Sequence, residues 1–219
     1  MGKGINIDKV LAGGPDSDEI VVNEFTEESA QEFRDKVLNV AKHDSQEPII
    51  VYIDSYGGSA DALAKMIETI DEVPNPVITV AIGKAMSCGA ILLSHGDMRF
   101  CGPHSRVMIH EVSGGAAGDV HDVKADAKEM ERLNRHFIGL LANNCKIKGG
   151  YDALRKIIKD QDGRDNYMDA EQSKKFGIVD GIGLPRVTKV HMYQIDIAPP
   201  KAKLRIQQKK PKKKSETKR

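Results

Sequence analysis

The sequence predicts an α/β fold built on a largely parallel sheet. Two observations lead to this prediction. Strand-like apolar runs alternate with helix-like amphipathic segments, and one segment, residues 119–144, has the apolar periodicity of a single long helix. With 219 residues, 40% of them hydrophobic, the chain is long enough to bury a substantial core.

The first predicted helix begins after Thr26, a residue type that caps helix amino termini. Glu27 and Glu28 in its first turn interact favourably with the helix dipole. The residues expected on its inward face recur at helical spacing and are Phe33, Val37 and Val40.

A second unit begins with the apolar run 49–53, which predicts a strand that ends in the paired glycines Gly57 and Gly58. A helical pattern follows it, with apolar residues at Leu63, Met66, Ile67 and Ile70. A glycine turn exposes backbone donors, so we expect the N–H of Gly58 to contribute to an oxyanion hole.

Ser87 lies among small residues between a predicted strand, 77–82, and an apolar helix that starts near Gly89. A serine at such a turn has its hydroxyl held out of the core. The backbone N–H groups that follow it, that of Cys88 first, point toward any anion that forms there. This arrangement suits acyl transfer.

A serine hydroxyl needs a base to activate it and a third group to orient that base. His110 ends the apolar run 106–109, so it stands at the carboxyl end of a predicted strand. Asp165 lies in a polar loop just before a helix that starts at Asp169. Asp162 or Asp169 would replace it as the orienting acid if the loop register differed, although Asp169 is better suited to cap the helix.

Several motifs occur in the same order and at similar spacing to those of a known family. They are the segments 52–58, 85–90, 99–110, 114–118, 164–165 and 170–180. From about residue 19 to residue 184 the chain therefore resembles the caseinolytic protease proteolytic subunit (ClpP) family of serine peptidases. The divergent start and the added tail are similar to ClpP-like proteases encoded by phages.

The resemblance implies the ClpP and crotonase-like fold of repeated β-β-α units, with residues 119–144 as a projecting handle helix. It implies Ser87 as nucleophile, His110 as general base and Asp165 as orienting acid, with the backbone of Gly58 and Cys88 as oxyanion donors. It also implies that substrate backbone binds by strand addition to the glycine-rich segment after the histidine. The residues of that segment are Glu111, Val112, Ser113 and Gly114.

The family resemblance further implies polypeptide substrates and a homo-oligomer of heptameric rings, stacked as a tetradecamer. Three positions depart from the family pattern. Tyr56 and Val112 replace prolines, and Lys84 stands where the family is apolar. Residues 1–18 do not resemble the family's amino-terminal loops, which contact an ATP-driven unfoldase, so the sequence supports that partner only weakly.

The net charge of +1 hides an uneven distribution. Residues 201–219 hold ten Lys or Arg and one Glu, a charge of +9, which leaves −8 on the rest of the chain. We expect a divergent segment at 1–18, a peptidase domain at 19–185, an extra strand within 186–200 and a disordered basic tail at 201–219. The tail either aids solubility or holds nucleic acid or an acidic surface electrostatically.

Composition argues against several other classes. Tryptophan is absent and aromatic residues make up 5%, which disfavours a base-stacking nucleic-acid platform. No apolar run is long enough to span a membrane, and no phosphate-binding loop is present, so we expect a chain that neither enters a membrane nor hydrolyses ATP itself. Three cysteines without paired spacing disfavour disulfides and zinc, so we expect a cytoplasmic protein without metal or cofactor.

The leading hypothesis from sequence is a serine endopeptidase. The alternatives are a crotonase-like acyl-CoA enzyme, in which the glycine turn stabilises an enolate, and a catalytically quiet assembly subunit that uses the fold as a scaffold.

Overall fold

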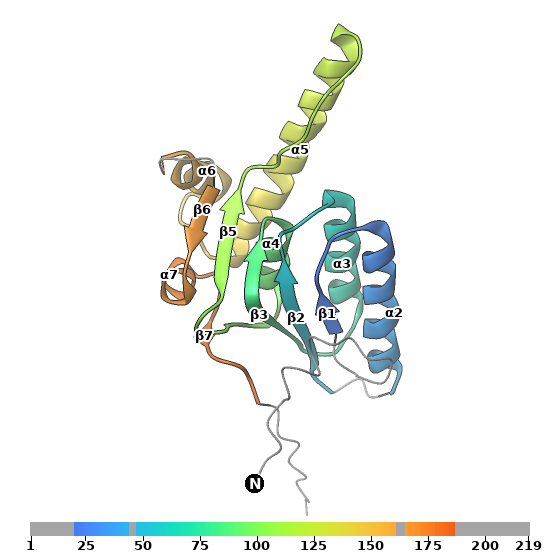
Figure 1. Cartoon of the computed structure of the whole chain (residues 1–219), viewed down its shortest axis with the longest axis vertical. Helices are drawn as coiled ribbons and strands as arrows, with labels where there is room; N and C mark the ends of the chain where they lie inside the picture. The colour runs from blue at the N-terminus through green and yellow to red at the C-terminus, as the bar shows by residue number, and fades with distance from the viewer. Residues whose placement is uncertain (1–19, 44–46, 161–164, 187–219) are drawn as a thin grey trace, which may run out of the picture. The chain divides into compact units, whose positions relative to one another are not determined.

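The chain folds around a mostly parallel sheet flanked by helices (Figure 1). The computed structural model describes residues 20–43, 47–160 and 165–186. The strands of the described chain are β1 (Ile20–Val22), β2 (Ile49–Ser55), β3 (Val77–Met86), β4 (Met98–Cys101), β5 (Arg106–His110), β6 (Asp165–Met168) and β7 (Gly181–Ile182). Their order is β1-β2-β3-β4-β7, and β5 pairs with both β3 and β6. All of these pairs are parallel except β5–β6, which confirms the predicted α/β class.

The longest described strand, β3, changes neighbours part-way along its length. Its residues 78–81 pair with β4, and its last residues, 84–86, pair with β5. The sequence predicted a strand over 77–82 alone, so β3 runs four residues further than expected. Because of this extension the ends of β3 and β5 lie side by side, which brings Ser87 and His110 together.

The helices of the described chain are α2 (Glu27–His43), α3 (Ala60–Glu72), α4 (Cys88–His95), α5 (Val120–Asn144), α6 (Gly150–Asp160) and α7 (Ala170–Phe176). In Figure 1, α4 lies behind β2 and β3, and α3 lies beside it on the side toward α2. Fully buried side chains fill this layer, among them Ile53, Leu63, Met66, Leu92 and Leu93. Burial of one such side chain contributes about 1.5–3 kcal/mol, so this layer holds the strand ends firmly in place.

The first helix, α2, begins where the sequence predicts. Thr26 Oγ1 accepts a hydrogen bond from the N–H of Ser29 (3.1 Å), and Ser29 Oγ accepts one from the N–H of Thr26 (2.9 Å). Phe33 and Val37 are buried, and Val40 packs against the core. The inward residues predicted for α3 are also buried, namely Leu63, Met66, Ile67 and Ile70.

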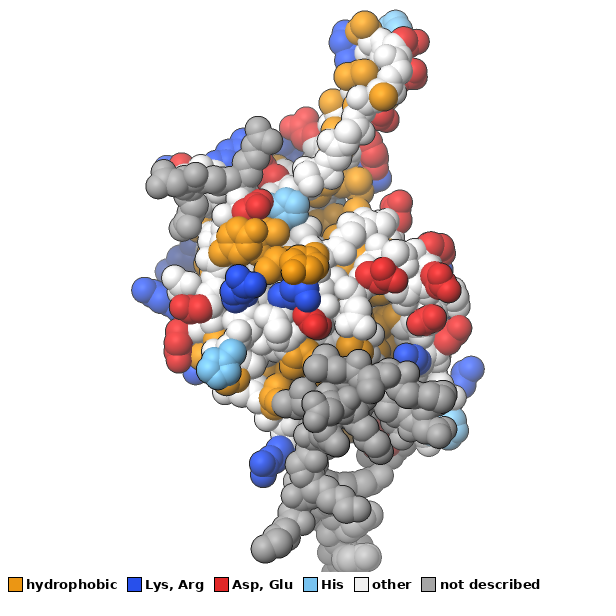
Figure 2. All heavy atoms as spheres, in the orientation of Figure 1, with side chains coloured by type: hydrophobic (Ala, Val, Ile, Leu, Met, Phe, Trp, Pro, Cys, Tyr) orange, Lys and Arg blue, Asp and Glu red, His pale blue; other side chains and the backbone are white. Residues whose placement is uncertain are grey.

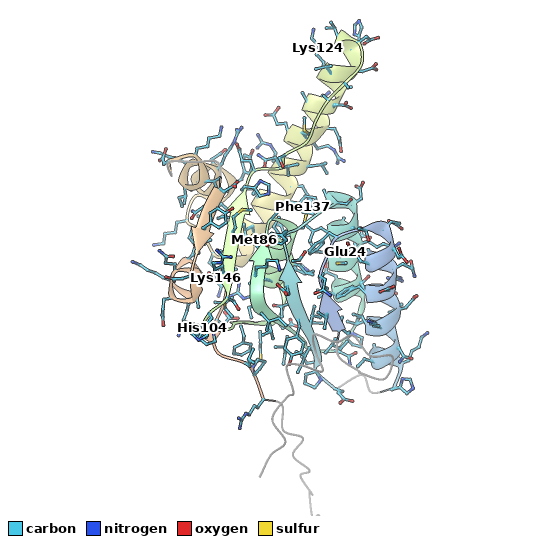
Figure 3. All side chains as sticks on the ribbon, in the orientation of Figure 1. Glu24, Met86, His104, Lys124, Phe137 and Lys146 are labelled. Atoms are coloured by element: carbon cyan, nitrogen blue, oxygen red, sulfur yellow. The ribbon has the colours of Figure 1, made fainter. Side chains whose placement is uncertain are left out.

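The two halves of α5 have different surroundings. Phe137 and Leu141, near its end, are buried in the core, whereas Val120 and Val123, near its start, are 67% and 40% exposed. Figure 1 shows the first half extending beyond the sheet, and Figure 3 labels Phe137 on the half that packs on it. Apolar side chains are visible on the extended half in Figure 2. The apolar stripe predicted for this helix therefore continues from the core into solvent.

Some sequence predictions fall outside the described residues. They concern the segment 1–18, the strand expected within 186–200 and the basic tail 201–219. Over the ranges that are described, the structure contains no helix that combines the length and the apolar character needed to cross a bilayer.

Candidate active site

Ser87 occupies a strained turn between β3 and α4. Its backbone has φ 54° and ψ −117°, a positive φ that non-glycine residues rarely adopt. The N–H of Ser87 donates a hydrogen bond to the carbonyl oxygen of Met108 on β5 (2.8 Å). This bond fixes the turn to the neighbouring strand. The sharp strand-to-helix junction predicted from the sequence is therefore present.

The side chain of His110 meets the hydroxyl of Ser87. Nε2 of His110 lies 2.7 Å from Ser87 Oγ, and the imidazole is half-buried at the end of β5. When the ring carries its proton on Nδ1, the hydroxyl donates to Nε2. This is the geometry that a general base needs to remove the hydroxyl proton.

Asp165 lies beside His110 but is not bonded to it. The residue begins β6, whereas the sequence predicted a loop position. It is paired with His110 across the antiparallel β5–β6 pair, and its side chain is exposed. Among the described side chains, no hydrogen bond joins this carboxylate to the imidazole. The structure therefore places Asp165 opposite His110 without forming the hydrogen bond between them that the predicted triad requires.

The alternative acids have other places in the chain. Asp169 caps α7, because its side chain accepts a hydrogen bond from the N–H of Gln172 (2.8 Å). That capping role agrees with the sequence analysis. Asp162 lies outside the described residues.

The turn after β2 packs directly against the nucleophile. Gly57 has φ +105°, and a Cβ added there would lie 2.8 Å from Ser87 Cβ. At Gly58 an added Cβ would lie 2.5 Å from the carbonyl oxygen of Phe25. The hydroxyl of Ser55 accepts a hydrogen bond from the N–H of Gly57 (3.1 Å), which holds the turn. Both glycines are therefore required by the close approach of the backbone.

The two residues predicted to form an oxyanion hole are in contact. Cys88 Sγ donates a hydrogen bond to the carbonyl oxygen of Gly58 (3.3 Å). As the first residue of α4, Cys88 has a backbone N–H with no acceptor inside the helix, at the positive end of the helix dipole. Burial raises the pKa of the Cys88 thiol, which therefore stays protonated and able to donate.

The segment after His110 forms one wall of a cleft of about 1260 Å³ that also contains Ser87, His110 and Asp165. All four residues predicted to bind substrate lie on this wall, namely Glu111, Val112, Ser113 and Gly114. The volume exceeds the roughly 300–1,000 Å³ of typical small-molecule pockets, which favours an extended ligand.

Two residues that the sequence analysis missed hold this segment in place. Asn134 of α5 is buried, and its Oδ1 accepts a hydrogen bond from the N–H of Val112 (3.0 Å). Its Nδ2 donates to Oε1 of Glu111 (3.1 Å), and Arg155 of α6 donates to the same oxygen (2.6 Å). Burial alone would raise the pKa of Glu111, but these hydrogen bonds hold it below its ordinary value. No local pattern in the sequence marks either residue, because their partners lie on other elements.

A second cavity, of about 780 Å³, lies at the other end of β3. Most of its charged side chains are engaged in contacts that stabilise the fold. His95 pairs with Asp71 (2.9 Å), Arg99 pairs with Asp180, and Asp97 accepts from the N–H of Val77 (2.8 Å). We therefore assign this cavity no chemistry.

Comparison with known proteins agrees with the cleft geometry. The family model described as Clp protease matches residues 16–186, which is well over half of the chain. The chain belongs to the Clp protease family. A curated Clp relative, the ATP-dependent Clp protease proteolytic subunit 1 of Rhodopirellula baltica, is 35% identical over 156 residues. The match covers 70% of this chain and 66% of that relative, just under two thirds of its length. The Clp resemblance predicted from the sequence motifs is confirmed.

Proposed function

We propose that this Clp family protein is a serine endopeptidase in which Ser87 is the nucleophile and His110 the general base. The observation that carries the proposal is the 2.7 Å contact between Ser87 Oγ and His110 Nε2. His110 takes the hydroxyl proton as Oγ attacks the scissile carbonyl. It then gives that proton to the leaving amine, and a water molecule activated by His110 hydrolyses the acyl-enzyme.

The backbone N–H groups of Gly58 and Cys88 stabilise the oxyanion of each tetrahedral intermediate. The contact between these residues and the amino-terminal position of Cys88 on α4 support this role. Asp165 turns its carboxylate toward Nδ1 of His110 in the active arrangement, where it holds the ring orientation and stabilises the imidazolium. Its opposed position on β6 supports this assignment.

Polypeptides are the substrates, bound by strand addition along residues 111–114. The N–H of Val112 is already occupied by Asn134, so it faces away from the cleft. Since backbone groups alternate in direction along an extended segment, Glu111 and Ser113 present theirs to the substrate.

The protein assembles with copies of itself through α5, because half of its apolar stripe is exposed in one subunit. Stacked heptameric rings enclosing the active sites are the assembly that the family resemblance implies. The basic tail, 201–219, adds a site for nucleic acid or another acidic surface. The family resemblance is the sole support for an ATP-driven unfoldase partner.

A fluorophosphonate probe, which reacts with activated serines, tests the proposal. We expect labelling of the wild-type oligomer at Ser87, no labelling of Ser87→Ala, and strongly reduced labelling of His110→Ala. Circular dichroism and native mass spectrometry serve as controls for folding and assembly. An assembled wild-type protein that stays unlabelled would favour the crotonase-like or catalytically quiet alternatives, since neither requires a serine activated by histidine.

A further inference from the structure

Tyr56 is the most exposed large apolar side chain among the described residues, at 73%. It follows β2 directly, precedes the glycine turn, and lines the same cleft as Ser87 and His110. An aromatic ring exposed in a cleft leaves a large apolar surface in water, which favours contact with a ligand.

The ring of Tyr56 is held in place by a charged pair beneath it. Nζ of Lys84 lies 4.5 Å from the ring centroid, within the range of a cation–π contact. The same ammonium group donates to Oδ1 of Asp54 (2.6 Å). Gly83 provides the room for this pair, because a Cβ added there would lie 2.9 Å from Asp54 Oδ1. Tyr56 and Lys84, two of the departures from the family pattern, thus contact each other.

The sheet order places Tyr56 relative to the nucleophile. β3 lies between β2 and β5, as Figure 1 shows, so the end of β2 and the end of β5 flank Ser87 on opposite sides. Residues 111–114 continue from β5, whereas Tyr56 continues from β2. Ser87 therefore lies between the segment 111–114 and Tyr56 along this edge of the sheet.

We infer that Tyr56, held by Lys84 and Asp54, forms a subsite for an aromatic or large aliphatic side chain next to the scissile bond of the substrate. This inference rests on the proposed peptidase function. The contact with Lys84 restricts the ring, which lowers the conformational entropy that Tyr56 loses when its apolar face stacks on the substrate. The subsite takes the residue on the side of the scissile bond away from the part paired with 111–114.

Two series of internally quenched peptides test the subsite. One series varies the residue just before the scissile bond and the other varies the residue just after it, each with Phe, Leu or Ala, and mass spectrometry locates the cut. The measured quantity is the ratio of kcat/KM for Phe over Ala within each enzyme, which does not depend on overall activity. In the wild type we expect a clear preference for Phe and Leu.

For Tyr56→Ala, we expect this ratio to fall about twofold to tenfold in one series, the range that an aromatic pair contributes. Tyr56→Phe keeps the ring and should keep the ratio. Lys84→Met removes the cation beneath the ring, so its Phe-over-Ala ratio should fall between the ratios of the wild type and of Tyr56→Ala. An unchanged ratio in Tyr56→Ala, or an equal fall in both series, would overturn the subsite while leaving the peptidase intact. A wild-type protein that fails to react with the fluorophosphonate probe would overturn both the subsite and the proposed peptidase function.

Discussion

His110 and Asp165 are directly opposed residues on the antiparallel strands β5 and β6. Side chains in such positions emerge on the same face of a sheet, with Cβ atoms about 4.5–5.5 Å apart. The Asp165 residue is exposed, and its carboxylate makes no hydrogen bond to the imidazole. The two strands are therefore in the right register for a Ser-His-Asp triad, but the bond between the acid and the histidine is not formed. We expect rotation of the Asp165 side chain, without movement of either strand, to form the proposed hydrogen bond to His110.

Replacing Asp165 with Asn tests this closure. Asp165→Asn keeps the size of the side chain but removes the charge that stabilises the imidazolium, so we expect kcat to fall roughly 10³- to 10⁴-fold. Peptide cleavage under saturating substrate measures this effect.

Asp169→Ala is the matched control for this change. It removes the cap of α7, four residues along the chain, and should lower the free energy of unfolding by about 1 kcal/mol. Its kcat should remain near the wild-type value. If Asp169→Ala lost turnover and Asp165→Asn kept it, the acid would have been assigned to the wrong residue.

The turn at Gly57 should tolerate no side chain. Gly57→Ala places a methyl group 2.8 Å from Ser87 Cβ at a backbone φ of +105°, so either the turn or the nucleophile must move. We expect fluorophosphonate labelling of Ser87 to slow by at least about tenfold, since small displacements of reacting groups are costly.

Gly139→Ala provides the comparison for Gly57→Ala. Gly139 lies on α5 with no atom within 4 Å of an added Cβ. Alanine there should stabilise the helix by about 1 kcal/mol and leave labelling unchanged. Equal labelling rates in the two variants would show that the contact between Gly57 and Ser87 has no role in catalysis.

Asn134 should act through the substrate-binding segment. Asn134→Leu fits the buried site but leaves the N–H of Val112 and one contact of Glu111 without a partner. We expect a loss of about 1–3 kcal/mol in stability and a higher KM for peptides.

Labelling by a small fluorophosphonate separates these effects, because the probe does not use residues 111–114. It should proceed at a similar rate in Asn134→Leu and in the wild type. A variant with unchanged KM would restrict Asn134 to a structural role.

Arg99 and Asp180 should make stability depend on pH. Arg99 Nε donates to Oδ2 of Asp180 (3.0 Å), and the guanidinium also donates to the carbonyl oxygens of Asn144 (3.1 Å) and Gly177 (3.0 Å). The hydrogen bonds from Arg99 hold the pKa of Asp180 below its ordinary value. The ion pair therefore stabilises the folded protein fully above the pKa that Asp180 has in the unfolded chain, about 3.9. This contribution to the free energy of unfolding is lost as the pH falls through the lower pKa that Asp180 has in the folded protein.

Unfolding by urea at pH 7 and at pH 3 measures this contribution. Asp180→Asn should be less stable than the wild type at pH 7, and the difference should narrow at pH 3. A difference that is the same at both pH values would mean that the charge on Asp180 contributes nothing to the fold.

Much of the fold could be predicted from local patterns. The cap at Thr26 follows from its residue type, and the inward residues of α2 and α3 follow from helical spacing. The strand β2 follows from the apolar run 49–53. The extension of β3 to Met86 could not be predicted in this way. Lys84 is polar, and what keeps it in a strand is pairing with β5, which lies beyond the reach of a local pattern.

The sequence by itself determined that a serine would stand at a strand-to-helix turn, that a histidine would end a strand, and that paired glycines would follow another. Each of these depends on neighbouring residues along the chain. The tertiary structure decided that β3 changes partners so that Ser87 and His110 meet at 2.7 Å, and that Asp165 lies opposite the imidazole without bonding to it. It also decided that Asn134 and Arg155 hold residues 111 and 112. These contacts join residues that are 22 or more positions apart, so strand register and helix packing set them rather than local sequence.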